Sequence, residues 1–256
     1  MTRKLPDANE EWLAFLQRAL LGLTKAGEQL KNDGAKYQAK RDWFRRKQQG
    51  IPRETSVSRA LANIFNQMRS SQMIQGRDWG VDLTNMIAEC EIPRPYDPGI
   101  ADEANPTDFR LTVIDEELDL RIEAKTLLSD NEISGHYLGL EGLKRFEDSN
   151  NPYTIAPYGG MVAYVVDKTK EEWSKNITSR LSVIDRPVYT LKLHEDFHVS
   201  SHTYTDRESS EKKQVDVVHF TIEVDAFPSK RLTTAIGPTA PLDDTGSAIS
   251  EPAPSL

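Results

Sequence analysis

The sequence predicts an α/β protein in which a mixed β-sheet is flanked by helices. Residues 106–128 alternate apolar and polar side chains on both sides of an acidic turn, which is typical of two antiparallel strands. Stretches with helical spacing precede and follow this hairpin. Residues 160–166 are a continuous apolar run, which is typical of a strand buried on both faces.

Two helices are expected before the main domain. Residues 9–31 carry one apolar stripe at helical spacing, which ends at Asn32-Asp33-Gly34. A second helix is predicted over 35–49 and stops at Gly50-Ile51-Pro52. We expect residues 1–50 to form a helical arm outside the core of the main domain.

The main domain is predicted to span residues 51–228. Its first helix covers 54–74, a shorter helix lies near 82–90, and a proline-rich loop over 91–106 leads into the hairpin. After the hairpin we expect a helix near 136–148, the buried strand, and a helix over 169–180. Two strands over 187–205 and 214–225 then form a C-terminal hairpin.

Glycines interrupt the helix predicted near 136–148. Gly139 and Gly142 lie inside it, although glycine costs about 1 kcal/mol in a helix interior. They indicate either a close approach of backbone or ligand, or a frayed first turn. Beyond the main domain, residues 229–256 have almost nothing to bury and are predicted to be a disordered tail.

The register of the central hairpin follows from its pattern. With the turn at Asp115-Glu116, Asp108 lies opposite Glu123 and Arg110 lies opposite Arg121. Side chains alternate between the two faces of a strand, so one face of the hairpin is apolar and the other is charged. Lys125 shares the charged face with the two acids.

Two opposed acids require an explanation. Their Cβ atoms would be about 4.5–5.5 Å apart, and two carboxylates at that distance repel each other unless a cation neutralises them. Mg²⁺ binds one or two carboxylates together with water and phosphate oxygens. Asp108 and Glu123 suit that role, and Lys125 could orient a water or stabilise charge on a phosphate. The alternative is a solvated face on which Asp108 pairs with Arg121, and Arg110 with Glu123.

The order of elements and two short motifs resemble the PD-(D/E)xK nuclease superfamily. Pro106-Thr107-Asp108 resembles the first half of its motif and Glu123-Ala124-Lys125 the second half. The resemblance covers residues 54–167, and it is strongest to small prokaryotic nucleases of restriction and anti-phage defence.

This resemblance implies a restriction-endonuclease-like fold and a Mg²⁺-dependent nuclease, with Mn²⁺ as an alternative ion and DNA favoured over RNA as substrate. It implies that the Ala124 carbonyl joins Asp108 and Glu123 as a metal ligand. The first core helix of the family often supplies a glutamate to the site. Glu54 is the candidate, although an acid there also favours the helix N-terminus. Glu89 and Glu91 are other candidates.

The charge distribution bears on the partner. A net charge of −8 argues against a protein that coats nucleic acid nonspecifically. One stretch is nevertheless basic and contains Trp43 and Phe44, which suits a surface that follows phosphates, or a solvated helix whose aromatics pack inward. The candidate phosphate contacts are Lys40, Arg41, Arg45 and Arg46 there, and Lys144 and Arg145 on the later helix.

Composition suggests the setting of the protein. Its 256 residues include one cysteine, Cys90, and no segment approaches the roughly 20 apolar residues that span a bilayer. We therefore expect a cytoplasmic protein without a membrane contact. The acidic charge favours dependence on a partner, such as an ATPase or helicase subunit, and a homodimer is one assembly to test.

Two alternatives stay open. His194, His198, His202 and His219 fall on the C-terminal strands, where a histidine could bind metal or act as a general base. The rival to an enzyme is a noncatalytic module that binds nucleic acid or protein on the same core.

Overall fold

A computed structural model describes residues 10–40, 42–45, 50–92, 107–114, 118–150, 152–184, 186–194, 196–206 and 209–224. Several predicted features therefore lie outside the described residues. These are Pro106, the turn at 115–116, the prolines of the 91–106 loop, Arg41, Arg46 and the tail over 229–256.

A seven-stranded mixed sheet forms the centre of the structure, in the order β1-β2-β3-β4-β7-β6-β5. Strands β3, β4 and β7 are parallel to one another, and the other neighbours are antiparallel. The strands are β1 (Met86–Ile92), β2 (Thr107–Val113), β3 (Asp119–Leu127), β4 (Tyr158–Val165), β5 (Val188–Lys192), β6 (Asp196–Thr205) and β7 (Lys212–Glu223).

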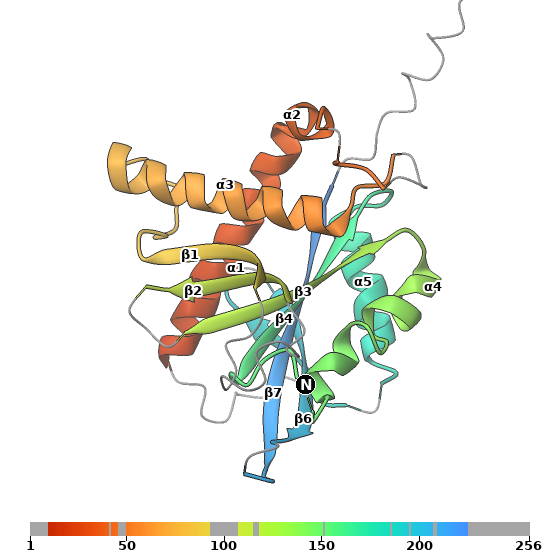
Figure 1. Ribbon diagram of the computed structural model, residues 1–256. Helices are drawn as coiled ribbons and strands as arrows, with labels where there is room; N and C mark the ends of the chain where they lie inside the picture. Colours follow the sequence, from red (N-terminus) through yellow and green to blue (C-terminus); the bar gives the residue numbers. More distant parts are fainter. Residues whose placement is uncertain are drawn as a thin grey trace, which may run out of the picture.

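Helices cover both faces of this sheet, as can be followed in Figure 1. Helices α1 and α3 pack on one face, and α5 packs on the other with the short turns that follow β3. The helical segments are α1 (Glu10–Asn32), α2 (Gly34–Gln38), α3 (Glu54–Gln75), α4 (Asp130–Glu132), the π-helical turn η1 (Ile133–Tyr137), the 3₁₀ turn η2 (Leu143–Glu147) and α5 (Lys170–Leu181).

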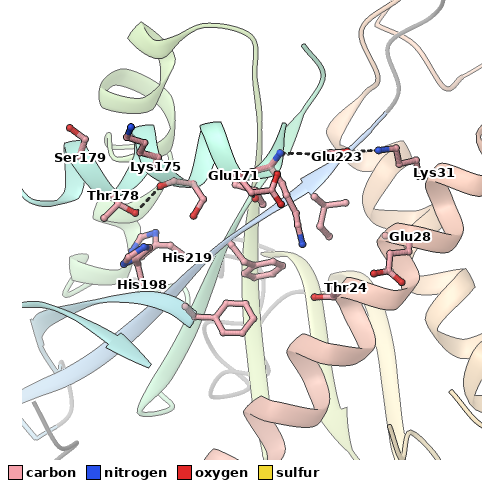
Figure 2. A pocket seen from close by; sticks show the side chains of 17 residues that line it. Thr24, Glu28, Lys31, Glu171, Lys175, Thr178, Ser179, His198, His219 and Glu223 are labelled. Atoms are coloured by element: carbon pink, nitrogen blue, oxygen red, sulfur yellow. Dashed lines mark hydrogen bonds and ion pairs between the residues drawn. The ribbon is translucent and has the colours of Figure 1, made fainter. Parts of the chain in front are cut away.

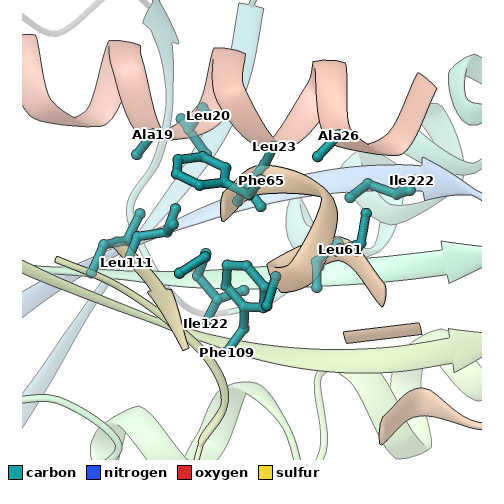
Figure 3. Packing of buried hydrophobic residues seen from close by; sticks show 14 of the residues in the cluster. Ala19, Leu20, Leu23, Ala26, Leu61, Phe65, Phe109, Leu111, Ile122 and Ile222 are labelled. Carbon is teal, nitrogen blue, oxygen red and sulfur yellow. The ribbon is translucent and has the colours of Figure 1, made fainter. Parts of the chain in front are cut away.

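Helix α1 belongs to the core. Its apolar stripe contacts α3 and the sheet, and Figure 3 shows Leu20 and Leu23 of α1 beside Phe65 of α3. The two helices approach closely at Gly22, where a Cβ atom would lie 2.6 Å from Cε2 of Phe65. The expected pair of N-terminal helices is present, but α1 is packed within the core instead of forming an arm outside it.

A second core lies on the opposite face. Phe146 of η2 and Trp173 of α5 are buried there against β4 and β7. Gly159 of β4 allows η2 to approach the sheet, because a Cβ atom at that position would lie 2.3 Å from Cε1 of Phe146. All of β4 is buried, as its apolar run predicts.

Four predicted elements differ from the structure. The helix predicted over 35–49 is the five-residue α2, which ends at Gln38, and Phe44 beyond it forms a β-bridge with Pro52. Residues 86–92 form strand β1, so the helix predicted near 82–90 is wrong. The helix predicted near 136–148 is also wrong: η1 and η2 occupy this region, and a Cβ atom on Gly139 would lie 1.8 Å from the Gly135 carbonyl oxygen. The single strand predicted over 187–205 is divided into β5 and β6.

The C-terminal hairpin is an integral part of the sheet. Strands β6 and β7 pair as predicted, but β7 also pairs with β4 along its length, from Tyr158 opposite Asp216 to Val165 opposite Glu223. The last strand of the described residues is therefore an inner strand. None of the helices among the described residues is long and apolar enough to cross a bilayer.

Candidate active site

The predicted register of the central hairpin is confirmed. Phe109 pairs with Ile122, and Arg110 pairs with Arg121. Asp108 and Glu123 follow these pairs at the same end of the hairpin. The apolar face, which includes Phe109 and Ile122, packs under α1 and α3.

The charged face of the hairpin is half-buried at most positions and fully buried at two. Arg121 is 1% exposed and Glu123 is 5% exposed, so this part is not the solvated surface of the alternative interpretation. The outer part of the face does carry ion pairs: Arg110 contacts Glu89 at 3.3 Å and Asp119 at 3.0 Å. Glu89, one of the alternative acids, therefore forms an ion pair with Arg110.

Two carboxylates replace the hydrogen bonds of β2 where the β2–β3 pairing ends. Asp108 accepts the backbone N–H of Ala124 at 2.9 Å, and Glu54 accepts the N–H of Thr126 at 2.7 Å. The N–H and C=O of one strand residue point to the same side of the strand. The Ala124 carbonyl therefore points to the side on which Asp108 and Glu54 lie.

Glu123 lies at the centre of this group. Its Oε1 is 2.5 Å from Nζ of Lys125, and its carboxyl group also hydrogen-bonds to Asp108 and to the hydroxyl of Tyr153. The side chains of Glu123 and Lys125 are 6% and 15% exposed. Strands β2 and β3 thus bring together the acids and the lysine that the sequence predicts.

The protonation of the group reflects this crowding. Burial raises the pKa of Glu123 to about 8; the charge of Asp108 adds to the rise, and Lys125 and Tyr153 oppose it. Burial also raises the pKa of Asp108, against the opposing hydrogen bond from Ala124. The like charges of two adjacent carboxylates disfavour ionisation of both, so a proton on Glu123 or a further cation beside the pair relieves the repulsion that Lys125 only partly offsets.

Lys125 stays charged in this environment. Burial alone would lower the pKa of Lys125, but the surrounding acids, with Glu123 first, outweigh burial and raise it. A protonated amine held beside buried carboxylates can donate to a substrate oxygen and stabilise negative charge that develops there.

Oxygen ligands suitable for a divalent cation gather at this site. Among the described residues, no three His, Cys, Asp or Glu side chains are grouped closely enough to hold a metal by themselves. The site instead offers the Asp108 and Glu123 carboxylates and the Ala124 carbonyl. This set fits Mg²⁺, which takes one or two carboxylates and fills its other positions with water and phosphate oxygens.

Helix α3 places Glu54 at the edge of the site. Glu54 is its first residue, and its carboxylate also accepts from Arg45 at 3.2 Å. The helix is joined to β4 by a buried 2.8 Å hydrogen bond between Ser58 and Tyr164. The negative charge of Glu54 contributes to the raised pKa of Asp108, because it disfavours a second negative charge nearby.

Some of the candidate phosphate contacts lie near the carboxyl pair, and others do not. Arg45 reaches the site through Glu54, and Arg145 acts electrostatically on Tyr153, so both lie near the carboxyl pair. Lys144 is exposed on η2. Lys40 is exposed with its ammonium 4.7 Å from the ring of Tyr37. Trp43 is buried in the core, so this aromatic packs inward.

A separate cavity of about 850 Å³ is lined by residues of α1, α5, β6 and β7. Figure 2 shows His198 and His219 facing α5, with Lys31 and Glu223 at the opposite side. Asp108, Glu123 and Lys125 are not among the described residues that line this cavity. The candidate active site therefore rests on the geometry of its side chains and not on this cavity.

Two of the four histidines, His202 and His219, are linked through the hydroxyl of Ser200. Ser200 lies 2.6 Å from Nε2 of His202 and 2.8 Å from Nε2 of His219, and Nδ1 of His202 lies 2.8 Å from Glu147. Burial lowers the pKa of both imidazoles, although Glu147 opposes the shift at His202. We interpret this buried chain of hydrogen bonds as a structural network that joins β6, β7 and η2.

Tyr153 is the residue of the site that the sequence does not predict. It belongs to the segment between η2 and β4, which carries no recognisable motif.

In comparisons with protein-family models, curated proteins and solved structures, nothing matched this chain.

Proposed function

We propose that the protein is a metal-dependent nuclease that hydrolyses phosphodiester bonds, with DNA favoured over RNA. One observation carries the proposal: two carboxyl groups, the half-buried Asp108 and the buried Glu123, are hydrogen-bonded on adjoining strands with the ammonium of Lys125 beside them. Burial of two adjacent acids is costly unless a cation joins them.

Each residue of the proposed site would have its own role in hydrolysis. Asp108, Glu123 and the Ala124 carbonyl would hold Mg²⁺ or Mn²⁺, which polarises a phosphate and lowers the pKa of its bound water. Lys125 donates to the attacking water or to the phosphate oxygen on which charge develops. Arg45 and Arg145 flank the group and would bind the neighbouring phosphates.

The topology supports the same proposal. Helix α3, the aspartate strand β2, the Glu-x-Lys strand β3 and the parallel strand β4 follow one another in the order of the PD-(D/E)xK superfamily, which the sequence resembles. Glu54 at the start of α3 would take the place of the glutamate that this family often adds. A setting in restriction or phage defence, an ATPase or helicase partner and a homodimer stay predictions.

Plasmid cleavage tests the proposal. We expect the purified protein to cleave plasmid DNA with Mg²⁺ or Mn²⁺ and to be inactive in EDTA. Asp108→Ala removes a metal ligand and Lys125→Met removes the ammonium, so each should reduce the cleavage rate at least about 100-fold. Circular dichroism should show that both variants remain folded.

Two exposed positions supply matched controls. Glu141→Gln removes an acid and Lys212→Met removes a lysine, both at exposed sites, and we expect wild-type rates from each. Wild-type cleavage by folded Asp108→Ala or Lys125→Met would contradict the assignment. Retardation of DNA without metal-dependent cleavage by the wild-type protein would favour the noncatalytic module.

A further inference from the structure

Tyr153 is held rigidly at the edge of the carboxyl pair. Its side chain is 6% exposed, and its ring packs edge-on against Phe146 with 5.3 Å between the ring centroids. Its backbone N–H donates to the Arg145 carbonyl at 3.3 Å. Gly159 allows Phe146 to lie against the sheet. The position of the Tyr153 hydroxyl is thus fixed by packing.

That hydroxyl donates a hydrogen bond to Glu123. Burial raises the pKa of Tyr153 above its usual value, and the charge of Glu123 adds to the rise. The phenol therefore remains protonated, and remains a donor, throughout the range in which proteins are usually active.

Lys125 and Tyr153 hold the same carboxylate but differ in charge. The ammonium of Lys125 would repel a divalent cation, and it must leave Glu123 to reach a water or a phosphate. The hydroxyl of Tyr153 is neutral and can keep its bond while a cation is present. Donors of this kind fix the orientation of metal-binding carboxylates.

We propose that Tyr153 is a positioning residue that keeps the Glu123 carboxylate directed toward Asp108 when Lys125 turns to the substrate. This inference rests on the proposed function. Lys125 would hold Glu123 in the protein without a cation, and Tyr153 would hold it in both states. Tyr153 itself does not touch the reacting atoms.

Metal binding tests this inference directly. In Tyr153→Phe the ring and its packing on Phe146 remain, and only the hydroxyl is lost. We expect Mn²⁺ to bind about 10–100-fold more weakly to the variant than to the wild-type protein, as measured by electron paramagnetic resonance of free Mn²⁺. The Mg²⁺ concentration for half-maximal cleavage should rise by a similar factor, and the rate at saturating Mg²⁺ should change little.

Tyr189 provides a matched control, because its hydroxyl donates to Asp216 at 2.7 Å, away from the site. Tyr189→Phe should bind Mn²⁺ like the wild-type protein. In a Glu123→Gln background, adding Tyr153→Phe should weaken Mn²⁺ binding much less than it does in the wild-type background. Such a pattern assigns the effect to the contact with Glu123 and not to a general loss of structure.

The two proposals fail in different ways. If Tyr153→Phe and wild type bind Mn²⁺ equally, while Asp108→Ala abolishes binding, the positioning role is overturned and the proposed nuclease stands. If the wild-type protein does not bind Mn²⁺, or if Asp108→Ala binds it equally well, the nuclease proposal is overturned and the role of Tyr153 falls with it.

Discussion

Glu123 couples the binding of protons to the binding of metal. It is buried beside Asp108, which raises its affinity for a proton, and beside Lys125, which lowers that affinity. A cation at the same place would supply the positive charge that the proton now supplies. Metal binding should therefore release a proton, and it should strengthen as pH rises.

The stability of the metal-free protein should depend on pH through Glu123. The pKa of this acid is raised from 4.5 to about 8 in the folded protein. Between these values the folded protein keeps a proton that the unfolded chain has lost, so stability is greatest below the lower value and declines as pH rises to the higher one. Urea unfolding in EDTA at about pH 5, 7 and 9 measures this decline.

Two further measurements identify the responsible group. Glu123→Gln cannot titrate, so its stability should decline less with pH, while the exposed Glu141→Gln should behave like the wild-type protein. Mg²⁺ should restore stability at the highest pH, where the acids are charged. An undiminished decline in Glu123→Gln would assign the dependence to other groups.

Sequence periodicity predicts the positions of the candidate catalytic residues, but it does not predict the residues that tertiary packing places around them. Asp108, Glu123 and Lys125 lie on two strands whose alternation fixes the register, so their proximity follows from local pattern. Tyr153 reaches Glu123 from a segment without periodic pattern, and only tertiary packing places it there. The same holds for Arg121, whose burial depends on elements distant in the sequence.

At the scale of elements, the contact between α1 and α3 depends on the absence of a side chain at Gly22. Its Cβ atom would lie 2.6 Å from Phe65 and 2.9 Å from Leu83, both buried. Gly22→Ala gains about 1 kcal/mol in helix propensity but overpacks the core, which costs about 1–3 kcal/mol. We expect a net loss of about 1 kcal/mol in the free energy of unfolding, measured with denaturant.

Gly135 is the control for this substitution. Nothing lies within 4 Å of the Cβ atom that alanine would add there, so Gly135→Ala should not destabilise the protein. Equal stability of Gly22→Ala and the wild-type protein would show that α1 and α3 can separate without loss, and that their packing is loose.

The mispredicted elements show where local pattern is ambiguous. In β1, Met86, Ala88 and Cys90 alternate with Ile87 and Glu89, which is a strand pattern that sequence reasoning missed. Of the two explanations that the sequence offers for Gly139 and Gly142, the structure shows the close approach of backbone. The two glycines end regular helix there instead of interrupting it.

At the scale of the molecule, the two faces of the sheet are stabilised by helices that lie far apart in the sequence. Helix α1 contributes buried side chains to one face, and α5 to the other. A deletion of residues 1–32 removes Phe15, Leu16, Leu20, Leu23 and Leu30 from the core. Each such side chain contributes about 1.5–3 kcal/mol, and together they match the total stability of a typical domain, about 5–15 kcal/mol.

We therefore expect the chain without residues 1–32 to lack a cooperative unfolding transition. Deletion of residues 229–256 should leave the transition unchanged, since that tail is predicted from its composition to bury almost nothing. Thermal unfolding followed by circular dichroism measures both. A folded core without residues 1–32 would restore the interpretation of an independent arm.

The place of β7 within the sheet affects how the newly made protein matures. Until residues 212–223 leave the ribosome, β4 lacks one of its two neighbours, and its unpaired backbone is a template for association with other chains. Residues 212–223 must therefore be made before the sheet can close. A chain that stalls early leaves β3, and the acids that it carries, beside an unfinished sheet, and such a product is a natural target for chaperones and proteases.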